Sequence, residues 1–156
     1  MPMIHHELSH WPLVISIAAG PSTLADMEAF TREWDRWLAR GEPFASLRVF
    51  ADQASLVHPE GSAQKARQWL QDKSQTIRAQ VIGMANVVPA SDYERMRKMN
   101  VEKLFGVPAD TFQDVPSALS WLRERVFAPR KLPFDEQAVA AGIEAVLATA
   151  AKRGRA

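Results

Sequence analysis

Residues 11–51 read WPLVISIAAGPSTLADMEAFTREWDRWLARGEPFASLRVFA and contain, in immediate succession, the patterns of a strand, a helix and a second strand. The first apolar run, residues 11–19, is rich in β-branched side chains and stops at Gly20, as buried strands often do. Apolar side chains then recur at helical spacing: Leu24, Met27, Phe30, Trp34, Trp37 and Leu38. Residues 44–51 are again strand-like. Parallel strands joined by such a helix form a right-handed crossover, so the pattern predicts an α/β protein.

The remaining chain repeats this alternation. It predicts helices over residues 62–79, 91–104, 114–126 and 135–150, a third strand over 80–88 and a short extended piece at 111–113. We therefore expect a mainly parallel four-stranded sheet with packed helices in residues 1–127. Residues 128–156 are expected to form a linker and a C-terminal helical extension.

Composition excludes several classes of function. The 156 residues include no cysteine, which rules out disulfide scaffolds, thiol nucleophiles and cysteine-based metal sites. A net charge of +1 supplies no overall field toward nucleic acid, so nucleic-acid binding is not expected. No apolar run approaches the ~20 residues that span a bilayer, and the first residues lack the pattern of a secretory signal. We expect a cytoplasmic protein without a membrane span.

One segment resembles a known family. Residues 112–122 read F-x-D-x-P-x-A-L-x-W-L, a short strand with a phenylalanine followed by a capped amphipathic helix. This pattern resembles the C-terminal half of STAS-like domains, which include the bacterial anti-sigma-factor antagonists and the SpoIIAA-like proteins. The resemblance implies a regulatory or interaction module, and it implies a protein partner or an apolar ligand rather than a substrate.

The same resemblance implies a phosphorylation site. Antagonist members carry a phosphorylated serine at the start of the helix after the second core strand, where free backbone N–H groups favour a phosphate. Ser62 is the nearest equivalent, and Ser55 lies earlier in the same loop. Neither belongs to the family's Asp-Ser motif, and Ser62 would equally serve as a simple helix N-cap.

A catalytic alternative rests on the strand ends. Asp52 follows the second strand, where open α/β sheets place functional groups, and His58 lies in the next loop. With Asn86 they could form the site of a small enzyme if they converged in one cleft. The competing interpretation is a turn-forming aspartate and an ordinary loop histidine, because no phosphate loop, nucleophile elbow or zinc-protease motif accompanies them.

Three further features bear on binding. Arg95, Arg97 and Lys98 make one helix locally basic, although a solvated helix face explains the same charges. Trp37 would mark an interface if it were exposed. The histidines near the N-terminus, His5, His6 and His10, are interpreted as an incidental exposed arm rather than a metal site.

We interpret the chain as a non-catalytic interaction module without metal or cofactor. A small enzyme and an immunity-type inhibitor are the alternatives. The C-terminal helix carries an apolar stripe that must be buried, either on its own sheet or by self-association: Val139, Ile143, Val146 and Leu147.

Overall fold

The computed structural model describes residues 3–155, with side chains up to residue 151. Its centre is one five-stranded sheet with the strand order β1-β2-β3-β4-β5. The strands are β1 (Met3–Glu7), β2 (Leu13–Ala19), β3 (Phe44–Phe50), β4 (Val81–Val87) and β5 (Ala109–Phe112). Strands β2 to β5 are mutually parallel and β1 is antiparallel to β2. The predicted α/β class and the mainly parallel sheet are confirmed.

The fifth strand is the N-terminal one, and here the prediction of an exposed arm was wrong. Met3 pairs with Ala19 and Glu7 pairs with Ile15, so β1 completes the edge of the sheet. The short connection to β2 returns the chain directly alongside itself, which only an antiparallel pair allows. His5 and His6 therefore belong to a strand and point to opposite faces of the sheet.

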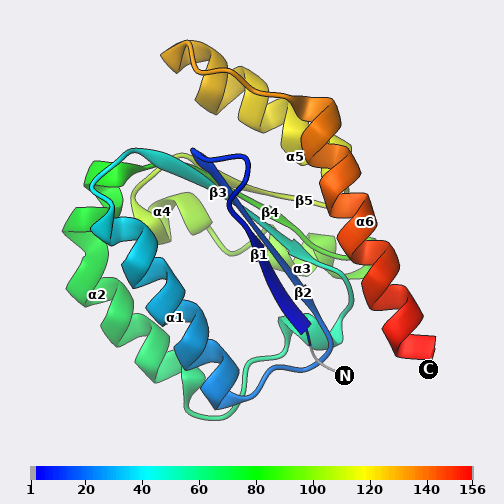
Figure 1. Cartoon of the computed structure of the whole chain (residues 1–156). Coiled ribbons are helices and arrows are strands. Elements are labelled where there is room, and N and C mark those ends of the chain that lie inside the picture. The colour runs from blue at the N-terminus through cyan, green and yellow to red at the C-terminus, as the bar shows by residue number, and fades with distance from the viewer. Residues whose placement is uncertain (1–2, 156) are drawn as a thin grey trace.

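Two long helices cover one face of the sheet, as Figure 1 shows: α1 (Leu24–Ala39) and α2 (Ser62–Gln80). Thr23 begins α1 with a capping box, because its hydroxyl accepts the N–H of Asp26 while the Asp26 carboxylate accepts the N–H of Thr23. Trp37 is 1% exposed and packs in the core with Trp34. The suggestion that Trp37 marks an interface is therefore wrong, because the residue belongs to the buried stripe of its helix.

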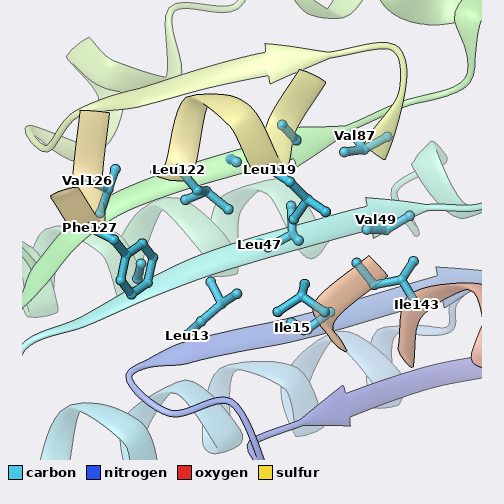
Figure 2. Packing of buried hydrophobic residues seen from close by; sticks show 14 of the residues in the cluster. Leu13, Ile15, Leu47, Val49, Val87, Leu119, Leu122, Val126, Phe127 and Ile143 are labelled. Carbon is cyan, nitrogen blue, oxygen red and sulfur yellow. The ribbon is translucent and has the colours of Figure 1, made fainter. Parts of the chain in front are cut away.

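The opposite face is covered by α5 (Val115–Trp121), the π-helical segment η3 (Leu122–Phe127) and α6 (Glu136–Arg155). Figure 2 shows Leu119, Leu122 and Phe127 directed toward the strands. Val139 and Ile143 of α6 are each 1% exposed and join this core, so the C-terminal stripe folds back on its own sheet. A short 3-10 turn, η4 (Ala128–Arg130), precedes the connection to α6.

The helix predicted over residues 91–104 is wrong. The segment forms a 3-10 turn, η2 (Ala90–Asp92), and two short helices, α3 (Tyr93–Met96) and α4 (Val101–Phe105). Asn100 interrupts the pattern because its side chain accepts the N–H of Lys103 and caps a new helix. Met99 and Leu104 of this segment are 50% and 51% exposed.

Within residues 3–155, no helix has both the length and the apolar character needed to cross a bilayer.

Candidate functional site

A row of polar side chains crosses the otherwise apolar sheet. The register pairs His6 with Ser16, Ser16 with Arg48, Arg48 with Asn86 and Asn86 with Thr111, so one residue comes from each strand. We call these five residues the polar row. Side chains at paired positions point to the same face. Trp37 of α1 contacts the His6 ring and Trp34 lines a cavity with Arg48, which places the row beneath α1 and α2.

Two side-chain hydrogen bonds connect members of the polar row. The Nε of Arg48 donates to the Oδ1 of Asn86 at 2.9 Å, and the Nδ1 of His6 lies 2.9 Å from the Oγ of Ser16. Ser16, Asn86 and Thr111 are buried, with 4%, 5% and 6% of their surface exposed. Buried polar groups cost stability unless they are paired, so a row of them in a sheet core needs an explanation.

A cavity of about 300 Å³ lies over the Arg48 end of the polar row, which gives that explanation. Its lining residues come from the sheet and from α1, α2, α3 and α4, and Figure 1 shows α1 and α2 over this face. Most of its wall is apolar: Met27, Phe30, Trp34, Phe50, Leu56, Trp69, Leu70, Met84, Val88, Met96, Met99, Val101, Leu104 and Phe105. Arg48, Asn86 and Thr111 supply polar groups from the sheet. This volume falls at the lower end of the range for small-molecule sites.

The charge of the cavity has one sign. Arg48 and Arg67 line it, whereas none of the lining residues is an aspartate or glutamate. Burial lowers the pKa of the Arg48 guanidinium to about 10, and no nearby charge contributes to this shift. Arg48 therefore stays protonated at neutral pH, and within residues 3–151 it forms no ion pair. Its Cζ lies 5.8 Å from the centre of the Phe105 ring.

Exposed apolar side chains mark one side of the cavity. Met99 and Leu104 line it while half of each side chain faces solvent. They belong to the interrupted segment around Asn100, whose two helices have only four and five residues. Short elements of this kind open more readily than strands do, so we assign this side as the entrance.

Among the residues of the catalytic alternative, Asp52 accepts hydrogen bonds from the backbone. Its carboxylate accepts the N–H of Gly20 at 3.0 and 3.1 Å and the N–H of Ser55 at 2.9 Å. His58 is exposed at the cavity and forms no hydrogen bond with Asp52, while Asn86 is bonded to Arg48. Asp52 therefore has the turn-forming role. It forms no acid–base pair with His58, and Asn86 is bonded to Arg48 instead.

The two serines considered for phosphorylation are both buried. Ser55 is 8% exposed, and its hydroxyl donates to the backbone oxygen of Asp52 at 2.6 Å. Ser62 is 3% exposed and is the first residue of α2, whereas Gly61 occupies the cap position in a left-handed conformation, with φ of 83°. The interpretation of Ser62 as an N-cap is therefore wrong, because its Oγ has no hydrogen-bond partner among the described residues.

The basic cluster lies outside the cavity. Arg95 bonds the buried carboxylate of Asp92 at 3.1 Å, and Arg97 pairs with Glu94 at the same distance. Lys98 is exposed. Two of the three charges are therefore neutralised by carboxylates one helical turn away.

Two other kinds of site, a second hollow and a metal centre, have weaker support. A second hollow of about 300 Å³ lies between β1 and α1, but its Asp26 is already used in the cap of α1. Within the described residues, no group of three or more histidine or carboxylate side chains is placed to hold a metal ion.

Sequence reasoning missed Arg48 altogether. The signal that could have found it is an ionised residue within an apolar run, FASLRVF, since buried charges without partners are rare.

Comparison with known proteins adds nothing to this geometry, because no protein-family model, curated protein or solved structure matches the chain.

Proposed function

We propose that this chain is a non-catalytic module whose cavity beneath α1 and α2 binds a small, mainly apolar molecule. The observation that carries the proposal is the mainly apolar cavity of about 300 Å³ over the polar row. An apolar pocket with a few convergent polar groups is the usual form of a small-molecule site. The resemblance of residues 112–122 to STAS-like domains, for which an apolar ligand was one expectation, also favours binding of an apolar molecule.

The experiment fills the cavity from one wall. Ala66 and Ala79 are both exposed on α2, but only Ala66 also lines the cavity. The variants Ala66→Trp and Ala79→Trp therefore add the same side chain to the same helix, only one of them at the cavity. Binding of the neutral apolar dye Nile red is measured by fluorescence titration, with circular dichroism as the check on folding.

We expect saturable binding of one dye per chain for the unmodified protein and for Ala79→Trp. Ala66→Trp should lose most of this binding while keeping its fold. Equal binding by both variants would place the dye elsewhere and contradict the proposal. If Ala66→Trp fails to fold, the smaller change Ala66→Leu, which narrows the cavity, provides the second test.

A further inference from the structure

We propose that the ligand is an amphipathic carboxylic acid whose carboxylate binds the terminal amino groups of Arg48 inside the cavity. This inference rests on the proposed function and names the class of molecule that the cavity takes. Its basis is the position of Arg48, which has no ion-pair partner, in a mainly apolar cavity whose lining includes no aspartate or glutamate.

The first step of the argument concerns charge. A half-buried cation loses part of its hydration, which is costly unless an anion accompanies it, and no carboxylate of the protein lines the cavity. Arg67 also lines the cavity, but it is exposed and water screens its charge, so the positive field inside the cavity comes mainly from Arg48 and favours an anion. The cavity is thus complementary to a negatively charged group, and the protein itself does not supply one.

The second step concerns the geometry of Arg48. Asn86 accepts the hydrogen of Nε, so the side of the guanidinium that includes Nε is already used. The two terminal amino groups form no hydrogen bond with residues 3–151. Together they present parallel N–H donors at the spacing of the two oxygens of a carboxylate. Asn86 also holds the guanidinium plane in place, which reduces the entropy lost when the ligand binds.

The third step concerns the rest of the ligand. Beyond Arg48 the wall is made mainly of apolar side chains, which leads toward the half-exposed Met99 and Leu104. A molecule with one charged end and an apolar body matches this arrangement, with its carboxylate inward and its apolar end toward the entrance. A polar metabolite would leave its hydroxyl or amino groups unpaired against the apolar wall.

The test compares three ligands that share one alkyl chain: dodecanoate, methyl dodecanoate and dodecyl phosphate. Each is titrated by calorimetry into the full chain at neutral pH, below the concentration at which it forms micelles. Arg48→Met, which keeps much of the length of the side chain and removes the charge, is compared with Arg36→Met, an arginine on the outer side of α1.

We expect dodecanoate to bind roughly ten- to a hundredfold more tightly than its methyl ester, because a charged hydrogen bond contributes about 1.5–3 kcal/mol. Arg48→Met should abolish this preference and leave binding of the ester nearly unchanged, while Arg36→Met should preserve it. Arg48→Lys should retain part of it, since it keeps the charge and loses the paired donors.

The outcomes separate the two proposals. Equal affinity for dodecanoate and its ester would overturn the assignment of a carboxylate and leave the apolar site standing. Tighter binding of dodecyl phosphate would assign a phosphate monoester instead. A preference removed by Arg67→Met but retained in Arg48→Met would move the anion to the other arginine. If none of the three ligands binds, both the carboxylate and the proposed function fail.

Discussion

The two faces of one sheet have been built in different ways. The face beneath α5, η3 and α6 is apolar throughout and closely packed, whereas the face beneath α1 and α2 carries the polar row and a cavity. Both faces are made by the same strands, because successive side chains alternate between them. In β3, for example, Leu47 and Val49 face the packed side and Arg48 lies between them on the cavity side. Both faces therefore hold a buried core, but only the face beneath α1 and α2 combines its core with polar side chains and a cavity.

The largest expected effect comes from truncating side chains on the two faces. Leu122 is fully buried on the packed face, and Leu122→Ala should lower the free energy of unfolding by about 3 kcal/mol, because it leaves a cavity. Met99→Ala at the cavity entrance should change it by less than about 0.5 kcal/mol. Urea denaturation monitored by tryptophan fluorescence measures both. Comparable losses would show that Met99 is as closely packed as Leu122 and does not lie at an opening.

A second prediction concerns how closely the packed face is fitted. A Cβ added to Gly83 of β4 would lie 2.5 Å from the Cγ2 of Val126, closer than carbon atoms approach. Gly83→Ala should therefore cost about 1–3 kcal/mol by overpacking. Combining it with Val126→Ala should cost less than the sum of the two single changes, since the second removes the clashing methyl groups. Additive effects in this double-mutant cycle would argue against direct contact.

The sequence predicted the fold well because apolar periodicity is a local property. The alternation in LVISIAA and FASLRVF and the helical stripe of Trp34 and Trp37 are each visible within one segment. The errors occurred where a few polar atoms outweigh the pattern. Asn100 caps a new helix inside an apparently continuous amphipathic stretch, and pairing with β2 orders an N-terminal segment that contains few apolar residues.

The candidate site could not be predicted for a different reason. The polar row depends on the register between strands that are far apart in sequence: Arg48 meets Asn86 across 38 positions. The pattern within one strand does not show which residue of another strand it pairs with, because the register also depends on the partner strand and on the turns between them. Asp52 and His58 were singled out for their place after a strand. Of the polar row, Asn86 was considered only as a possible third member of that site, and His6 only as part of an exposed arm. Attention to unexpected polar residues within apolar strands would have found Ser16, Arg48 and Asn86 together.

A third prediction concerns the polar pair that faces the cavity. The double variant Arg48→Met with Asn86→Leu removes a buried charge and its hydrogen-bond partner at once, so neither is left unpaired. We expect the ligand-free protein to become more stable by about 1 kcal/mol, since replacing buried charged groups with apolar ones is often stabilising. Thermal unfolding followed by circular dichroism measures this. A lower Tm would mean that Arg48 is needed for folding rather than for binding.

The smallest expected effect is at the other end of the polar row, where His6 contacts Trp37 and Phe30 at ring distances of 5.1 and 5.2 Å. Burial lowers the pKa of His6 from its ordinary value of 6.5, only partly offset by Glu33. Below pH 6.5 the unfolded chain therefore binds more protons at this residue than the folded chain does. The stability contributed by neutral His6 is complete above pH 6.5, is lost as the pH falls toward the lowered pKa and declines no further beneath it.

Replacing His6 tests this directly. His6→Gln keeps a hydrogen-bonding group near Ser16 but does not titrate, so the loss of Tm between about pH 7.5 and pH 5.5 should become smaller than in the unmodified protein. His58→Gln, which removes an exposed histidine, controls for the loss of one titratable residue. An unchanged pH dependence in His6→Gln would show that the imidazole is as well solvated in the fold as in the unfolded chain. In that case water would reach the polar row at His6, and only the part of the row near Arg48 would be shielded from solvent.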